Sequence, residues 1–123
     1  MPMQRSLTES PKKGELYITD LDPAFGREIH KKRPVLVISA NMYNENTPHV
    51  VIIPISSIIS NTITPEMVLL GKIKGLDKES VLLPIYIRSI DQHRLIKKVG
   101  RISGKKLKDV EHAISLVLGM VKI

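Results

Sequence analysis

The chain has 123 residues and a mass of 13.8 kDa, which suffices for one domain with a moderate core but not for two ordinary domains. Its 42% hydrophobic and 25% charged residues place it among ordinary globular proteins and outside the disordered class. Nineteen Lys and Arg against twelve Asp and Glu give a formal net charge of +7, which favours an anionic partner, while the absence of Cys excludes a disulfide framework, a thiol nucleophile and cysteine-based metal sites.

The N-terminal segment from Met1 to Gly14 contains no apolar stretch that could act as a signal sequence. The longest apolar runs, which are Val35–Ile38, Val50–Ile59 and Val81–Ile87, are too short to span a bilayer. We therefore expect a flexible tail over residues 1–12, a single domain over residues 13–123, no membrane contact and a cytoplasmic location.

The first half of the chain predicts three strands. Glu15–Asp20 is rich in β-formers, Pro34–Ser39 is a continuous β-branched run typical of a central strand buried on both faces, and His49–Ser56 ends at a pair of serines. Between these strands, Asp22–Lys32 predicts a charged loop and Asn41–Pro48 has turn chemistry throughout. Two of the apolar runs contain proline, which a buried strand tolerates only at an edge or a bulge.

The second half predicts further short strands and one helix. The expected elements are, in order, a loop over Ser60–Pro65, a strand over Glu66–Leu70, a turn over Lys74–Lys78, a strand-like segment over Ser80–Asp91, a helical turn over Gln92–Arg94 and a strand over Ile96–Ile102. From Ser103 the apolar residues recur at helical spacing, with Ser103 a suitable N-cap and Gly119 a suitable stop. Five or six consecutive short strands and a C-terminal amphipathic helix predict a mainly β fold, built as a small, strongly bent antiparallel sheet or barrel.

Standard nucleotide, hydrolase and metal motifs are missing from the sequence. The four His residues lack zinc-ligand spacing, the glycines are isolated in turns, and no nucleophile elbow occurs. One Phe, three Tyr and no Trp cannot form a multi-base stacking platform, so any RNA binding must rest mainly on phosphates, base edges and a few stacking residues. Basic residues cluster at Arg27–Arg33, Arg94–Arg101 and Lys105–Lys108, and the second and third clusters can equally be solvated surfaces.

The stretch from Leu21 to Ser57 carries the most information. It contains Asp-Pro-Ala-Phe-Gly-Arg-Glu from Asp22, a basic loop, Arg33-Pro-Val, a strand, an Asn, a second strand, and Pro54-Ile-Ser-Ser. In order and spacing these pieces resemble the MazF/PemK (Kid) family of toxin endoribonucleases of type II toxin–antitoxin systems. The likeness continues through Gly75-Leu-Asp-Lys-Glu-Ser-Val, Ile87-Arg-Ser-Ile-Asp and Arg94-Leu, and covers about residues 13–120.

The resemblance implies an antiparallel SH3-like barrel of the MazF/CcdB type with a C-terminal α-helix, paired as a homodimer. It implies cleavage of single-stranded RNA (mRNA) without metal or cofactor, in which the 2′-hydroxyl of the RNA attacks the adjacent phosphate and leaves a 2′,3′-cyclic phosphate and a 5′-hydroxyl. It also implies a cognate antitoxin, of which an acidic disordered segment folds on binding.

The resemblance assigns the phosphate chemistry to three residues. Arg33 matches the catalytic arginine, whose fork of donors suits phosphate oxygens. Ser56 stands where the family usually has threonine, so it keeps the hydroxyl but loses the β-branch that stiffens the side chain. Glu28 matches the acidic loop residue and is a candidate general base. The residues expected to bind RNA are Arg27, His30, Lys31, Lys32, Ser57, Tyr86 and Arg88.

One departure from the family pattern bears on activity. Family members commonly place an acidic residue and a glutamine, and some a catalytic arginine, just before Arg88, where this chain has Leu83, Ile85 and Tyr86. Tyr86 can stack on a base or pack within its strand. The alternatives to an active nuclease are a degenerate member that binds RNA but cleaves it poorly, and a non-catalytic module acting by protein contact, as CcdB-like gyrase poisons do on the same barrel.

Overall fold

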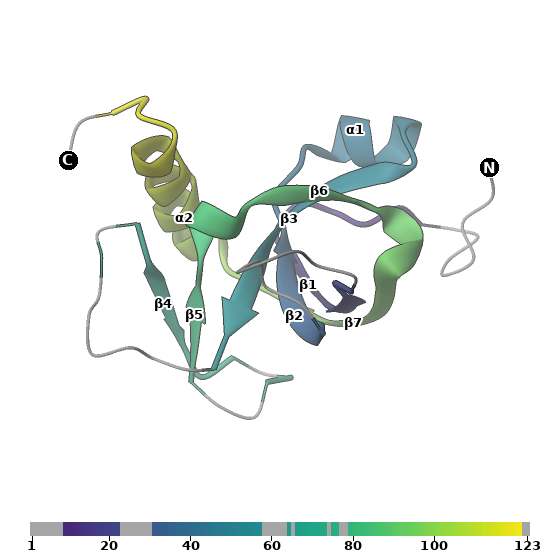
Figure 1. The fold of residues 1–123 in the computed structure, drawn as a ribbon, viewed down its shortest axis with the longest axis horizontal. Helices are drawn as coiled ribbons and strands as arrows, with labels where there is room; N and C mark the ends of the chain where they lie inside the picture. Colours follow the sequence, from purple (N-terminus) through teal and green to yellow (C-terminus); the bar gives the residue numbers. More distant parts are fainter. Residues whose placement is uncertain are drawn as a thin grey trace.

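The computed structural model describes residues 9–22, 31–57, 64, 66–73, 75–76 and 79–121. Within this part, the strands form one antiparallel sheet in the order β4-β5-β3-β2-β1-β7, and β6 pairs with β3 beside that path (Figure 1). The strands are β1 (Glu15–Asp20), β2 (Lys32–Val37), β3 (His49–Ser56), β4 (Val68–Gly71), β5 (Ser80–Leu82), β6 (Arg88–Asp91) and β7 (Leu95–Arg101). The helical elements are α1 (Asn41–Asn46), η1 (Pro84–Tyr86), η2 (Gln92–Arg94) and α2 (Gly104–Val117).

The bent antiparallel sheet with a C-terminal helix agrees with the expected fold class. β1, β3 and η2 have the bounds that the sequence predicts, because turn-forming residues flank each of them. The described part contains seven strands rather than five or six. The expected division into a tail over residues 1–12 and a domain over residues 13–123 stays a prediction, since residues 1–8 lie outside the described residues.

The prediction of a turn over Asn41–Pro48 is wrong, because its first six residues form the short helix α1. The buried side chain of Asn44 accepts a hydrogen bond from the Ser39 hydroxyl at 2.5 Å and donates to the Ser39 carbonyl at 3.1 Å. Thr47 closes the helix, because its hydroxyl donates to the Tyr43 carbonyl at 3.0 Å. Polar side chains that favour turns in isolation therefore stabilise a helical turn here.

The expected continuous strand over Ser80–Asp91 is also wrong, because η1 interrupts it. β5 pairs with the end of β3 and β6 pairs with its beginning, so the partner of β3 changes midway along the strand. Pro54 lies at this change, and its carbonyl accepts a hydrogen bond from the Leu83 N–H at 3.1 Å. Proline is tolerated in this central strand because its missing N–H falls where the ladder is interrupted.

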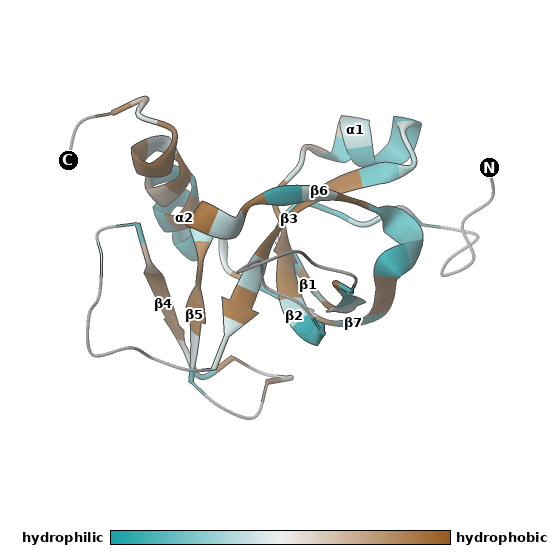
Figure 2. Cartoon of the chain, in the orientation of Figure 1, coloured by the Kyte–Doolittle hydropathy of each residue, from teal (hydrophilic) through white to brown (hydrophobic). Residues whose placement is uncertain are grey.

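Both faces of β2 and β3 are apolar because each face covers a core cluster. Leu36 and Ile53 belong to the first cluster, which α2 covers with Val110 and Ala113. The residues of the opposite face form a second cluster, which comprises Tyr17, Leu21, Val35, Val37, Val50, Ile52, Ile90 and Leu95. Figure 2 shows the result as brown strands in the sheet, a mixed α2 and a mostly teal α1. Alternation along the strands thus divides the buried aliphatic residues of β2 and β3 between the two clusters.

The ends of α2 match the sequence prediction. The Ser103 hydroxyl accepts a hydrogen bond from the Lys106 N–H at 3.1 Å and caps the helix. Gly119 follows the helix with a positive φ of 71°, the conformation for which glycine is favoured. Among the described residues, no helix combines the length and the apolar character needed to cross a membrane.

Gly75 fixes the turn before Leu76 against β7. Its φ is +99°, and a Cβ atom at this position would lie 2.4 Å from the Val99 carbonyl oxygen. We expect Gly75→Ala to lower the free energy of unfolding, measured in urea, by about 2–3 kcal/mol, since it adds strain and a backbone clash. The matched control is Gly104→Ala, where a Cβ meets nothing within 4 Å. This control should be neutral or stabilising by up to about 1 kcal/mol, and equal unfolding midpoints for the two variants would contradict the argument.

Candidate active site

Three polar side chains form a row across the ends of β1, β2 and β3. Thr19 on β1 lies directly opposite Arg33 on β2. β2 pairs with β3 through Val35 opposite Pro54, and the same register, continued by two residues, sets Arg33 opposite Ser56. Side-chain alternation directs all three toward the face of the second cluster. This polar row (Thr19, Arg33 and Ser56) is the border of an otherwise apolar face.

A cavity of about 420 Å³ opens at the ends of β2 and β3. It is lined by Lys31, Lys32, Arg33, Pro34, Ile55, Ser57, Leu76 and Ser80. Four of these residues are ones that the sequence assigned to catalysis or RNA binding, and three of the four are cationic. Ser56 does not line the cavity itself: it is only 8% exposed and lies between the lining residues Ile55 and Ser57, whose side chains alternate with its own. A cavity lined by one sign of charge favours an anionic ligand.

Arg33 is suited to hold a phosphate from a fixed position. Its side chain is half-buried on a strand with a neighbour on each side, and both Arg33 and Ser56 already have interaction partners. A guanidinium presents paired donors to two oxygens of one phosphate, which a lysine ammonium does not.

The base of the β1–β2 loop is fixed by hydrogen bonds. The Asp22 carboxylate accepts from the Lys31 N–H at 2.9 Å, and the Leu21 N–H donates to the Lys31 carbonyl at 3.1 Å. Lys31 adopts a φ of +73°, a left-handed conformation that costs a non-glycine residue about 1 kcal/mol. Arg94 Nη1 donates to the Asp22 carbonyl at 2.6 Å and to the Asp20 carbonyl at 3.3 Å. Both ends of the loop are therefore held where they join the sheet.

The remaining predicted site residues fall into two groups. Arg27, Glu28 and His30 lie outside the described residues, so their roles stay predictions. Tyr86 and Arg88 do not line the cavity. Tyr86 is half-buried in η1, which packs against α2.

Arg88 begins β6 on the face of the second cluster, opposite Ile52. Its Nη1 atom is buried and has no hydrogen-bond partner among the described residues. A buried guanidinium nitrogen without a partner is costly and calls for an acceptor. An anionic ligand on this face would supply one.

Sequence reasoning missed Thr19 and Arg94 as members of the site. Arg94 was visible as part of a basic cluster and of the family pattern, but not as a member of the site, because the carbonyls that it binds lie 72 and 74 residues earlier in the chain. Thr19 carries no motif, and a polar residue in the middle of a β-rich run was the one signal that could have singled it out.

Two carboxylates with a lowered pKa lie outside the cavity. Burial of Glu15 raises its pKa, but hydrogen bonds from Lys98, the Lys12 backbone N–H and Tyr17 together hold the pKa below its ordinary value. The backbone N–H of His93, followed by its side chain, lowers the pKa of Asp91. Neither carboxylate is positioned to act in the cavity. Within the described ranges, His, Asp and Glu side chains form no group of three that could hold a metal ion.

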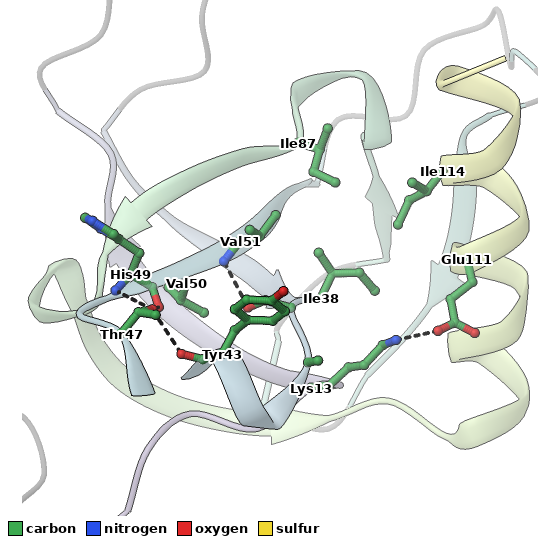
Figure 3. Close-up of a pocket in the computed structure, with 12 residues that line it drawn as sticks. Lys13, Ile38, Tyr43, Thr47, His49, Val50, Val51, Ile87, Glu111 and Ile114 are labelled. Atoms are coloured by element: carbon green, nitrogen blue, oxygen red, sulfur yellow. Dashed lines mark hydrogen bonds and ion pairs between the residues drawn. The ribbon is translucent and has the colours of Figure 1, made fainter. Parts of the chain in front are cut away.

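A second cavity, of about 550 Å³, is almost entirely apolar and lies between α1, β3 and α2. Figure 3 shows the side chains of Ile38, Ile87 and Ile114 facing this space, with the ring of Tyr43 at its edge. The ion pair of Lys13 with Glu111 joins the β1 side to α2 across one border. Lys13 and Glu111 are paired with each other, and the rest of the lining is mostly apolar, so this cavity is suited to receive apolar side chains.

The family model of the PemK-like, MazF-like toxins of type II toxin–antitoxin systems matches residues 12–118. The chain belongs to this family. A curated relative, the endoribonuclease MazF of Staphylococcus saprophyticus, is 37% identical over 110 residues, which are 89% of this chain and 92% of the relative. The expectation of a MazF/PemK-type toxin is thereby confirmed.

Solved structures place this MazF-like toxin in the same fold. MazF from Deinococcus radiodurans superposes with a TM-score of 0.81 at 27% identity, covering 91% of this chain and 99% of that one. A MazE–MazF structure from the same organism matches with a TM-score of 0.69 at 25% identity, over 91% and 99% of the two chains. The MazF-like fold, a bent antiparallel sheet with a C-terminal helix, is confirmed.

Proposed function

We propose that this MazF-like toxin endoribonuclease cleaves single-stranded RNA by attack of the RNA's own 2′-hydroxyl, without a metal ion. The bond from O2′ to phosphorus forms as the bond from phosphorus to O5′ breaks, which leaves a 2′,3′-cyclic phosphate and a 5′-hydroxyl. The observation that carries the proposal is the cavity that Lys31, Lys32 and Arg33 line, with Ser56 next to it where the β2–β3 register is continued by two residues.

The roles follow from what this reaction requires. Arg33 binds the non-bridging oxygens and stabilises the charge that grows on them, and the Ser56 hydroxyl donates to the same phosphate. Glu28 takes the proton of the 2′-hydroxyl, and an acid must return a proton to O5′. The backbone of the bound strand is held by the cations Arg27, Lys31 and Lys32 and by the imidazole of His30, which belong to the cavity and the β1–β2 loop.

Three further residues extend this RNA surface. Ser57 lines the cavity beside Ser56 and donates a hydrogen bond to RNA. Arg88 supplies a guanidinium whose buried Nη1 needs an acceptor. Tyr86 stacks on a base, which replaces the hydrogen-bonding residues that other family members place before Arg88.

Incubating the pure protein with a mixed-sequence single-stranded RNA in EDTA tests the reaction. We expect cleavage in EDTA, products ending in 2′,3′-cyclic phosphate and 5′-hydroxyl, and protection of any site that carries a 2′-deoxy substitution. Intact RNA that is nonetheless shifted on a gel would overturn cleavage in favour of a degenerate RNA-binding member. Gyrase inhibition without any RNA binding would overturn both.

The net charge of +7 fits an acidic antitoxin as well as RNA. A relative has been crystallised as MazE–MazF, and we propose that this toxin likewise binds a cognate antitoxin that covers the cationic cavity. Antitoxin binding and RNA binding are then mutually exclusive.

We propose that the apolar cavity of Figure 3 lies in the interface of a homodimer. An interface with two-fold symmetry needs both a hollow and a projection on the same patch. The patch has both. The cavity is the hollow, and two exposed side chains are the projections. Tyr43 at the edge of the cavity is 60% exposed, and Leu118, one turn of helix beyond Ile114, is 58% exposed. Tyr43 of one copy would enter the cavity of the other.

Tyr43→Asp is therefore expected to convert a dimer into a folded monomer. A carboxylate brought into the apolar cavity of the second copy loses its hydration without a partner, which weakens association by two orders of magnitude or about 3 kcal/mol. Sedimentation velocity at several concentrations measures the change. The matched control is Ile96→Asp, at a half-exposed apolar position on β7, which should leave the dimer intact. A wild-type protein that stays monomeric at every concentration would contradict the proposed interface.

A further inference from the structure

Thr19 is a polar residue in apolar surroundings. It is completely buried, and its side-chain oxygen has no hydrogen-bond partner in the part of the chain that the structure describes. The neighbouring residues at the same alternation are Tyr17 in β1 and Leu21 directly after it, both in the second cluster. A buried hydroxyl without a partner destabilises the fold, and valine would fill the same space without this cost.

The register leaves one suitable cross-strand partner for this hydroxyl. Thr19 lies between Arg33 on β2 and Leu95 on β7. The leucine offers neither donor nor acceptor, whereas the guanidinium carries five N–H donors. Residues directly opposite each other in an antiparallel pair have Cβ atoms about 5 Å apart, which is within reach of an arginine side chain.

We propose that Thr19 is a positioning residue for Arg33. When Arg33 turns its outer donors toward an RNA phosphate, an inner N–H donates to the Thr19 hydroxyl, which then fixes the plane of the guanidinium. The hydrogen bond missing in the free protein forms as the phosphate is bound. This inference rests on the proposed role of Arg33 and extends the polar row to β1.

Thr19→Val and Thr19→Ser separate this role from a merely structural one. Valine removes the unpaired hydroxyl and keeps the shape, whereas serine keeps the hydroxyl and removes a methyl group. The order of thermal stability is therefore expected to be valine, threonine, serine, from high to low. The order of kcat for RNA cleavage should differ, because Thr19→Val loses about tenfold in kcat with KM within a factor of two. Thr19→Ser should keep at least half of the wild-type kcat.

Cleavage rates of Thr19→Val and Arg33→Ala, measured side by side, distinguish this inference from the proposed function. If Arg33→Ala abolishes cleavage but Thr19→Val cleaves like the wild type, the positioning role is overturned and the proposed function stands. If Arg33→Ala cleaves normally, the proposed function itself is overturned. A Thr19→Val variant with lowered stability and lowered kcat, matched by Thr19→Ser, would show a packing role and also overturn the inference.

Discussion

Replacing Arg33 by alanine is expected to lower kcat/KM for RNA cleavage by about 10³-fold while the protein stays folded. The transition state places an additional negative charge on the phosphate oxygens, and losing one preorganised donor to such a charge costs on the order of 10² to 10³ in rate. Arg33 supplies at least two donors, so the effect lies at the upper end of this range. Its side chain is only half-buried at the end of β2, so the thermal midpoint should change little. Initial rates with an RNA of defined sequence measure the effect.

Two variants distinguish the effect of the paired guanidinium donors of Arg33 from the effect of positive charge alone. Arg33→Lys keeps the charge but cannot bind two oxygens at once, and it should recover no more than about a tenth of the wild-type activity. Lys32→Ala removes an exposed cation that lines the same cavity. It should act mainly on KM and cost less than tenfold, because an exposed lysine contributes a screened point charge. If Arg33→Ala retained more than a tenth of the activity, Arg33 would be a general RNA-binding residue and not a catalytic one.

The sequence was sufficient for the elements that depend on local pattern. β3 has the predicted bounds because a mainly aliphatic run lies between Pro48 and Ser57, and Ser103 caps α2 as expected. The helix α1 was not predictable, because its polar residues are drawn into contacts from elsewhere in the fold. The Asn44 side chain accepts a hydrogen bond from the Ser39 hydroxyl, and the backbone carbonyl of Asn44 accepts one from the side chain of Gln92, 48 residues later.

The candidate site divides in the same way. Arg33 and Ser56 were predicted because they lie in motifs, and the β2–β3 register, continued by two residues, sets them opposite each other. Thr19 and Arg94 were not found, because their relation to the site comes from strand pairing and from hydrogen bonds to distant carbonyls. The residue type shows which chemistry a position can offer, whereas the strand register decides which residues lie close enough to act together.

Gln92 is the residue whose replacement should destabilise the fold most. It is 1% exposed, and its Nε2 atom donates to the carbonyls of Asn44 at 2.8 Å, Thr47 at 3.2 Å and His49 at 2.9 Å. These three carbonyls belong to the end of α1 and the start of β3. Gln92 also begins η2, whose last residue, Arg94, binds the base of the β1–β2 loop. One short turn therefore connects the α1–β3 junction to the candidate active site.

Gln92→Glu replaces these donors by an oxygen that faces three carbonyl oxygens. At pH 7 we expect a loss of about 4 kcal/mol in the free energy of unfolding, because a buried carboxylate is left without donors. Gln92→Met removes the donors without adding charge and should cost about 2–3 kcal/mol. Urea unfolding should thus rank wild type above methionine, and methionine above glutamate.

The pH dependence of Gln92→Glu provides the sharper check, since the lowered pKa of Glu15 gives the wild type no matching rise in stability as the pH falls from 7 toward 4.5. Burial without donors raises the pKa of the new glutamate in the folded state, so the folded protein binds the extra proton and stability rises as the pH falls from 7 toward 4.5. In the wild type, Glu15 has a lowered pKa, so its contribution is complete above the ordinary glutamate pKa and is lost as the pH falls through the folded value. A Gln92→Glu variant whose stability, like that of the wild type, did not rise between pH 7 and 4.5 would show that residue 92 is hydrated and that its three hydrogen bonds do not hold the junction together.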